Sequence, residues 1–214
     1  MSKASQEAYR KIRAGVLSGH FPAGQFVPED EFAQFCGLSR TPVREAIAEL
    51  VAEMLLQRSD TNRVFVPVWS DEDEEEMFTL RAMLESHCAQ RAARLITDEQ
   101  IAALQSHCDF IDAAIRQSGE PDVSGFVEGN RRFHAGILAA AQSERLAQLL
   151  RFVVSQVVVH RTAEQYSRAD MEQSQRDHRD LVNAFAVRDG VWASAITNTH
   201  IRRAANAYKT HRAT

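Results

Sequence analysis

Three histidines stand where apolar side chains are expected, on three different predicted helices. His134 lies in the apolar stripe of a helix predicted for about 122–142, and Asn130 lies four residues before it on the same face. His178 and His200 lie in the apolar stripes of two later helices. Buried neutral imidazoles are costly unless something shared satisfies them, and a divalent metal ion can do so. The pattern therefore predicts that the three side chains converge on a metal.

Two other interpretations fit the same histidines. They could be inert core residues, each hydrogen-bonded separately, in a domain that serves only for dimerisation. They could also be zinc ligands of a helical-bundle enzyme in which a bound water is the nucleophile. The sequence has no His-Glu-x-x-His motif and no clear general base beside the histidines, which argues against the enzyme.

The elements that must position these histidines are helices. From residue 70 to 214 the pattern predicts an all-α bundle, with no strand pattern and no internal repeat. Ser70 is the expected N-cap of its first helix, with Asp73 completing a capping box. The six predicted helices span about 71–95, 98–117, 122–142, 144–166, 170–188 and 190–211. In the first of them, Met77, Leu80, Leu84 and Leu95 are the expected apolar face.

The first 69 residues predict a separate domain. Helices are expected over 5–19, from Pro28 to a C-cap at Gly37, and from about Thr41 to Met54. Two short strands, 55–58 and 64–67, follow. The whole chain is thus expected to be mainly α, with an N-terminal winged helix-turn-helix over 1–69, a two-stranded wing, and a six-helix bundle over 70–214.

The third helix carries groups suited to reading DNA. Arg40, Thr41 and Arg44 lie at its N-terminus, and Val43 and Ile47 anchor its other face. A recognition helix enters the major groove by its first turn, where arginines can bind guanine or phosphate oxygens. An ordinary amphipathic surface helix would show the same periodicity, but the order of residues favours the recognition helix.

Charge, hydropathy and cysteine spacing limit the classes of protein that the sequence can represent. The net charge of −4 does not indicate a nucleic-acid binder, so the DNA-binding prediction depends on where the charges lie. The sequence shows no membrane-spanning run and no signal-peptide pattern, which predicts a cytoplasmic protein without membrane contact. Three cysteines without a paired spacing predict free, packed thiols.

The run Leu38–Ala46, Leu-Ser-Arg-Thr-Pro-Val-Arg-Glu-Ala, closely resembles the recognition helix of the GntR family of bacterial transcription regulators. Residues 19–24 resemble the loop that follows the first helix in that family. The resemblance implies a homodimeric regulator, not an enzyme. It also implies an inverted-repeat operator in double-stranded DNA, and repression as its mode of control. The sequence departs from the family at Asp30, where an arginine is usual, and at Arg63, where the wing usually has a glycine.

The helical part resembles the effector domain of the FadR branch, called FCD, in its shorter VanR-like type with six helices. Many such domains bind a metal through Asp-x-x-x-His and two later histidines. Here the ligand set reads Asn130, His134, His178 and His200, with Asn130 in place of aspartate. Imidazole ligands suit zinc, nickel, copper or iron, and an oxygen ligand with open coordination positions also admits manganese. Zinc, nickel and manganese are the metals expected at this site.

A small carboxylate could complete the open coordination sites of that metal. Arg81 lies in Leu-Arg-Ala-Met-Leu-Glu, which is similar to the family's motif at the start of this domain. The resemblance implies that Arg81 binds the acid group of the effector, together with Asn130 and the three histidines. His160 and Arg161 are weaker candidates for the cavity wall. The alternative for Arg81 is a surface ion pair with Glu85, four residues later.

Overall fold

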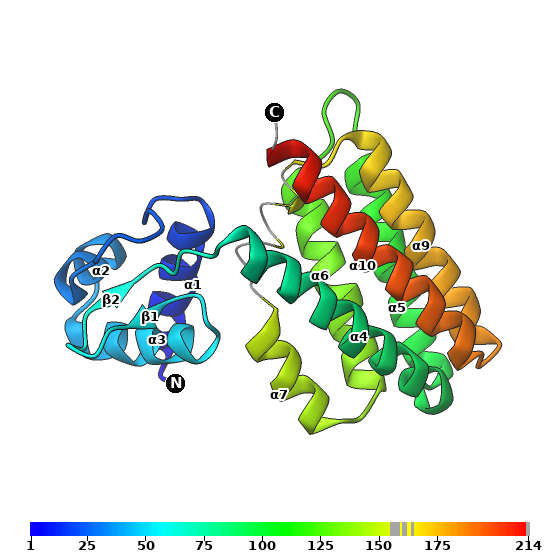
Figure 1. The fold of residues 1–214 in the computed structure, drawn as a ribbon, viewed down its shortest axis with the longest axis horizontal. Coiled ribbons are helices and arrows are strands. Elements are labelled where there is room, and N and C mark those ends of the chain that lie inside the picture. Colours follow the sequence, from blue (N-terminus) through cyan, green and yellow to red (C-terminus); the bar gives the residue numbers. More distant parts are fainter. Residues whose placement is uncertain (155–158, 160–161, 164, 213–214) are drawn as a thin grey trace. The chain divides into compact units, whose positions relative to one another are not determined.

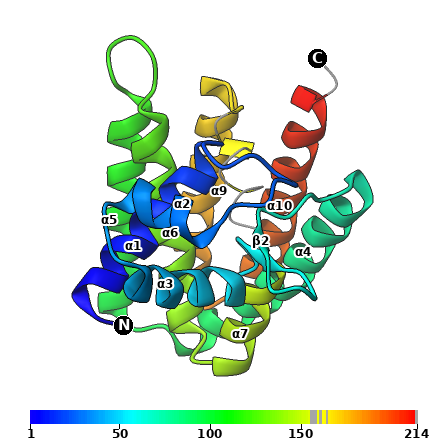
Figure 2. The ribbon, with the colours of Figure 1, turned by 90° about the vertical axis from the view of Figure 1, so that its left-hand side faces the viewer.

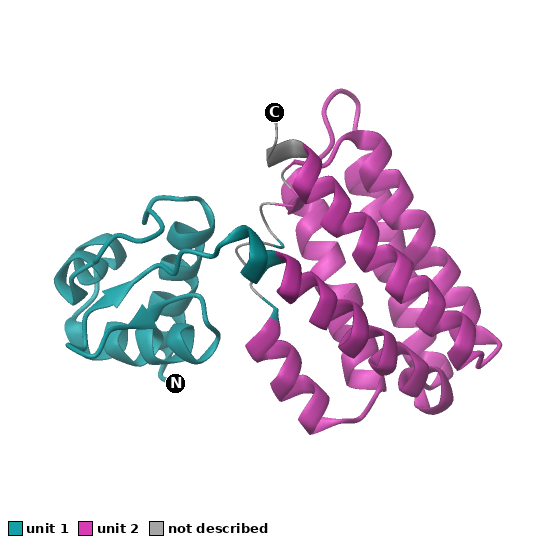
Figure 3. Ribbon diagram, viewed as in Figure 1, with its two compact units in different colours: residues 1–74, 154–159 teal, residues 75–153, 160–214 magenta. Residues whose placement is uncertain are grey.

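The computed structural model describes residues 1–154, 159, 162–163 and 165–212, and Figure 1 shows their fold. The chain is mainly helical, with one small two-stranded sheet, which confirms the predicted fold class. It divides into two compact units, residues 1–74 with 154–159 and residues 75–153 with 160–214 (Figure 3). None of the helices in the described ranges has both the length and the apolar character that a membrane crossing requires.

The described part of the first unit is a winged helix-turn-helix. Its elements are α1 (Lys3–Leu17), α2 (Glu29–Cys36), α3 (Arg40–Ala52), β1 (Gln57–Arg58) and β2 (Val64–Phe65). The strands are antiparallel, and Gln57 is paired with Phe65. Figure 2 shows α3 lying across this unit, below α2 in that view.

Local chemistry sets the bounds of α2 and α3. Gly37 ends α2 in the left-handed conformation, with φ 65°, as the C-cap prediction requires. Ser39 in extended conformation is the N-cap of α3, and Met54, with φ 58°, follows its end. One apolar core holds the three helices together and fixes the direction of α3. Its fully buried side chains include Ile12, Phe32, Val43, Ile47 and Leu50.

The second unit is a helical bundle. Its described helices are α4 (Asp71–Leu95, which begins at the end of the first unit), α5 (Asp98–Ile115), α6 (Val123–Ala140), α7 (Glu144–Val153), α9 (Arg168–Ala186) and α10 (Gly190–Arg212). α5 packs against α6 and α9, and α9 packs against α10. Ser70 and Asp73 form the predicted reciprocal cap at the start of α4. Cys36, Cys88 and Cys108 are buried free thiols, as predicted.

Two details of this bundle differ from the sequence prediction. The helix predicted for 144–166 ends at Val153, and Val154 is not helical. The buried face of α4 was also assigned wrongly in part. Leu80 and Leu95 are exposed, whereas the small residues Ala82, Ala89, Ala92 and Ala93 are buried with Cys88. Small side chains let neighbouring helices approach closely, so a search for large apolar residues misses this face.

Candidate metal centre and DNA-reading surface

Three helices of the second unit bring their histidines together. His134 comes from α6, His178 from α9 and His200 from α10. Their ring centroids are 5.5 Å apart for His134 and His178, 5.3 Å for His134 and His200, and 4.9 Å for His178 and His200. One ring nitrogen from each lies within 4.8 Å of the other two. His178 and His200 are buried and His134 is half-buried, so the sequence prediction of three inward, converging imidazoles matches the geometry.

Each imidazole is held through its Nδ1 atom by a different acceptor. Glu85 Oε2 lies 3.1 Å from His134 Nδ1, and Asp177 Oδ2 lies 3.4 Å from His200 Nδ1. Gln175 Oε1 lies 3.2 Å from His178 Nδ1. The Gln175 amide is itself oriented, because its Nε2 donates to the carbonyl of Cys108 at 2.8 Å. These contacts favour the tautomer with the proton on Nδ1, which leaves each Nε2 with a free lone pair.

Two of the three opposite ring nitrogens have no partner in the described part of the chain. Nε2 of His134 and Nε2 of His178 are buried and make no hydrogen bond to any described residue. Buried polar atoms are almost always hydrogen-bonded, so such an atom calls for an unseen partner. Metal-bound histidines characteristically donate the other ring N–H to a carboxylate or amide oxygen. The donor set therefore fits a divalent transition metal held by the three imidazoles.

Burial and charge set the protonation states of these groups. Burial, together with the neighbouring imidazoles, holds the pKa of His178 well below its ordinary value. Burial also lowers the pKa of His200, although the hydrogen bond to Asp177 opposes it. Burial alone would raise the pKa of Glu85. The charge of Arg81 and the hydrogen bond from His134 nevertheless hold that pKa well below its ordinary range. The cluster thus contains neutral His178 and His200 beside an ionised Glu85.

Arg81 is paired with Glu85, as one of the two sequence interpretations expected. Its Nε donates to Glu85 Oε1 at 2.9 Å. The pair is not on the surface, however, since the two side chains are only 7% and 13% exposed. Glu85 joins Arg81 to His134, because one carboxylate oxygen faces each of them. Arg81 is therefore part of the surroundings of the histidine cluster, while a role in binding an effector stays a prediction.

Asn130 lies one turn before His134 on α6 and is half-buried. This spacing places the two side chains on the same helix face. Its role as a ligand stays a prediction. The weaker candidates His160 and Arg161 lie outside the described residues.

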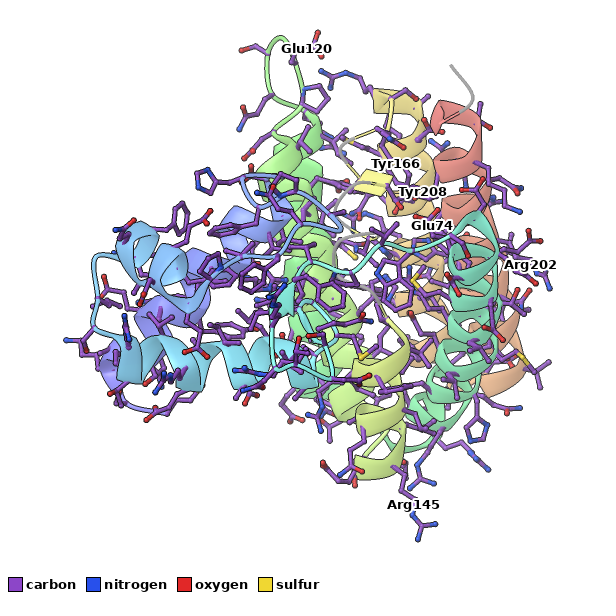
Figure 4. All side chains as sticks on the ribbon, turned by 60° about the vertical axis from the view of Figure 1, so that its left-hand side comes forward. Glu74, Glu120, Arg145, Tyr166, Arg202 and Tyr208 are labelled. Atoms are coloured by element: carbon purple, nitrogen blue, oxygen red, sulfur yellow. The ribbon has the colours of Figure 1, made fainter. Side chains whose placement is uncertain are left out.

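A polar cavity of about 430 Å³ lies along α9 and α10 and reaches the cluster at His200. Asp177 and Arg203 form an ion pair in its wall. Tyr166 also lines it, and Figure 4 labels this residue shortly before α9. Burial raises the pKa of Tyr166 to about 12, so its hydroxyl keeps its proton at neutral pH.

Sequence reasoning missed three residues that orient the imidazoles. The sequence predicts Glu85 only as a surface partner of Arg81, and periodicity alone does not select Gln175 or Asp177. A signal for Asp177 was present, since it lies four residues before Leu181 and hence on the buried face of α9. A buried carboxylate next to a buried histidine needs a partner, and the imidazoles are the nearest candidates.

The predicted DNA-reading arginines lie at the N-terminal end of α3, and each is paired with an acid of α2. Arg40 Nε lies 2.5 Å from Asp30 Oδ1, and Arg44 Nε lies 2.6 Å from Glu29 Oε2. Both arginine side chains are about 60% exposed, at 62% and 61%. The hydrogen bond from Arg44 holds the pKa of Glu29 below its ordinary value. Arg40 thus offsets the negative charge of Asp30, the acid at the position where the family usually has an arginine.

The wing places Arg63 beside an exposed aromatic side chain. The Arg63 guanidinium carbon is 5.3 Å from the centre of the Phe26 ring, which suits a cation–π contact. Asn62, with φ 61°, takes the left-handed position of the turn. Asparagine tolerates that conformation, so Arg63 does not need the freedom of the glycine that it replaces. Thr41, in the first turn of α3, is exposed.

Comparisons with known proteins assign both units of the chain to families of transcription regulators. Residues 4–66 match the model of the bacterial regulatory proteins of the gntR family, and residues 76–203 match the FCD domain model. An uncharacterised HTH-type transcriptional regulator of Agrobacterium vitis is 31% identical over 137 residues, which cover 63% of this chain and 78% of that protein. The Nta operon transcriptional regulator of Aminobacter aminovorans is 27% identical, with 87% and 86% covered.

A solved structure shares the fold. Escherichia coli McbR/YncC superimposes with a TM-score of 0.80, covering 99% of this chain and 100% of that chain at 20% identity. The matched families and the relatives are transcription regulators, so the interpretation as an enzyme is excluded. The chain belongs to the GntR family of DNA-binding transcription regulators, with an FCD domain as its C-terminal part.

Proposed function

We propose that the chain is a cytoplasmic, homodimeric repressor whose operator affinity is controlled by a small organic acid. In this proposal residues 1–69 bind an inverted-repeat operator, and residues 70–214 form the domain for effector binding and dimerisation. The inverted repeat follows from two-fold symmetry, because each winged unit reads one half-site.

Arg40, Thr41 and Arg44 are the proposed readers of the major groove, and Arg63 is the proposed contact of the wing. Their exposure supports this role, since all four side chains are accessible. The exposed ion pairs of Arg40 with Asp30 and of Arg44 with Glu29 do not prevent DNA binding. Surface ion pairs contribute at most about 1 kcal/mol, so phosphate or guanine oxygens can replace the carboxylates.

The proposed effector site is a metal centre with His134, His178 and His200 as nitrogen ligands and Asn130 as an oxygen ligand. The observation that carries it is the pair of buried, unpartnered Nε2 atoms on His134 and His178. Zinc, nickel or manganese would supply a Lewis acid with open coordination positions. Glu85, Gln175 and Asp177 orient the imidazoles through their Nδ1 atoms.

A carboxylate effector fits these surroundings. The bound cation would attract it, and the planar guanidinium of Arg81, whose Nε donates to Glu85, is the proposed partner of its acid group. The effector can change DNA affinity only if it binds one arrangement of the dimer more tightly than another. Release of the operator by the acid is the expected direction for a repressor.

The test begins with DNA fragments that the purified protein selects from a random pool, which we expect to contain an inverted repeat. Fluorescence anisotropy then measures operator affinity with and without a panel of small carboxylates. We expect at least one acid to weaken binding about tenfold or more, within the usual range of coupling between sites.

The double variant His178→Ala/His200→Ala should still bind the operator but lose that response. If no acid changes operator affinity, the helical unit serves only for dimerisation. If the selected DNA shows no shared sequence, the operator-binding proposal itself fails.

A further inference from the structure

Two acidic residues at the start of α2 bind the DNA-reading arginines in different ways. Asp30 binds Arg40 through both of its carboxylate oxygens, which accept hydrogen bonds from Nε and Nη2 at 2.5 and 2.6 Å. Glu29 binds Arg44 through Nε, which donates to Oε2 at 2.6 Å. Asp30 therefore covers one edge of the Arg40 guanidinium, including an Nη group, whereas the contact of Glu29 with Arg44 uses neither of the two Nη groups.

Glu29 also has a second cationic partner, Arg58 of β1. Its Oε1 atom lies 3.4 Å from Arg58 Nη2. Arg58 in turn donates from Nη1 to the side-chain oxygen of Asn62 at 3.0 Å, and so holds the wing turn in which Asn62 is left-handed. One series of contacts thus connects the wing turn, through Arg58 and Glu29, to the recognition helix.

Burial and charge also distinguish the two carboxylates. The Glu29 side chain is 24% exposed, whereas that of Asp30 is 58% exposed. The hydrogen bond from Arg44 holds the pKa of Glu29 below its ordinary value, and Arg58 acts in the same direction. Two guanidinium groups and one carboxylate leave Glu29 and its partners with one net positive charge, which attracts phosphate. Asp30 and its single partner have no such excess, so DNA displaces Asp30 more readily than Glu29.

We propose that Glu29 is a positioning residue for base recognition, which stays bound to Arg44 and Arg58 in the operator complex and directs the Nη groups of Arg44 to a guanine. This inference rests on the proposed reading role of Arg44 and deepens it, because it assigns Arg44 to a base and Arg40 to the phosphate backbone. Guanine presents O6 and N7 to a bidentate arginine in the major groove. A long side chain that is already held loses less conformational freedom when it makes this contact.

Removal of Glu29 should act differently on two kinds of DNA. Loss of an acid from the DNA-reading surface favours phosphate contacts, so affinity for a duplex without the operator sequence should stay level or rise. Affinity for the operator should nevertheless fall, because Arg44 must then be ordered during binding. A residue that merely lends negative charge to this surface would not lower operator affinity when it is removed.

The test is fluorescence anisotropy on the full chain, with the selected operator and a scrambled duplex of the same length and base composition. For Glu29→Ala we expect the ratio of operator affinity to scrambled-duplex affinity to fall about fivefold or more, since the ordering cost recurs in both half-sites. An unchanged or increased ratio would overturn the inference.

The matched control is Glu31→Ala. Glu31 is exposed in the same first turn of α2, so this variant loses the same charge from the same helix start. It should leave the ratio unchanged, and an equal fall would show that the helix start, not the contact with Arg44, sets the ratio. If Glu29→Ala is unfolded by circular dichroism, Glu29→Gln, which offers a neutral and weaker acceptor, should still lower the ratio about twofold or more.

Base-resolved measurements show whether Glu29 acts through Arg44. Guanines of the operator are replaced one at a time by 7-deazaguanine, which lacks the N7 acceptor. The guanine at which Arg44→Lys loses sensitivity to this replacement should also be the one at which Glu29→Ala loses it, with the other guanines unaffected. An equal loss of sensitivity at every guanine would indicate a general structural role and overturn the inference.

Arg44→Ala separates this inference from the proposed function. A normal affinity ratio in Arg44→Ala overturns the reading role of Arg44 and the positioning role of Glu29 together. A ratio that is lost in Arg44→Ala but kept in Glu29→Ala overturns the positioning role and leaves the reading role standing.

Discussion

Acidic side chains pair with arginines both on the α2–α3 surface and around the histidine cluster, but their surroundings differ. Asp30 and Arg40 are each more than half exposed, whereas Glu85 and Arg81 are almost completely buried. Water and salt screen the first pair, so its partners can be exchanged for DNA. The buried pair cannot be exchanged without leaving a charge in the interior. The same chemistry thus gives a replaceable contact in one unit and a fixed support for an imidazole in the other.

The largest expected effect comes from breaking the buried pair. Glu85→Gln leaves the Arg81 charge without a carboxylate and should lower the free energy of unfolding by about 3–5 kcal/mol. Urea denaturation of the metal-free protein measures it. Asp30→Asn, the exposed counterpart, should cost less than about 1 kcal/mol. Similar losses in the two variants would show that burial does not distinguish the pairs.

Removal of a reading arginine should affect DNA binding and leave the helical unit unchanged. Arg44→Ala is expected to weaken operator binding by about 1–3 kcal/mol for each half-site and so to abolish specific binding in practice. Anisotropy titrations measure the loss. The control is Arg145→Ala, at the start of α7 in the second unit, which should bind the operator normally. Normal affinity of Arg44→Ala would refute the assignment of α3 as the recognition helix.

The smallest expected effect is a gain of DNA affinity. Asp30→Asn frees the Arg40 guanidinium and removes a negative charge from the DNA-reading surface. Operator affinity should rise a few-fold at low salt. The slope of log affinity against log salt concentration should become steeper, by the amount that about one additional phosphate contact per chain would give. An unchanged salt dependence would mean that Arg40 does not reach the backbone.

The sequence was most informative where a polar residue interrupts an apolar stripe. His178 and His200 stood out in this way, and their helices were placed almost as observed because caps and periodicity agree there. The orienting residues were harder to find. Glu85 lies next to the partly buried Leu84, on a helix whose buried face is made largely of alanines. Periodicity of large apolar residues could not show that this acid points inward.

The wing shows a second limit of sequence reasoning. Arg63 stands where the family's wing usually has a glycine, but Asn62 supplies the left-handed residue of the turn. Loop conformation depends on which residue takes the unusual φ, and a one-residue shift is hard to foresee from composition.

The central claim is that His134, His178 and His200 bind one metal ion. The most direct measurement is elemental analysis by mass spectrometry of the purified protein, dialysed without chelator, beside the His178→Ala/His200→Ala variant. We expect about one equivalent of zinc, nickel or manganese per chain in the wild type, and almost none in the variant while its helical content is retained. A wild-type protein that binds no transition metal, or a variant that retains the full equivalent, would contradict it.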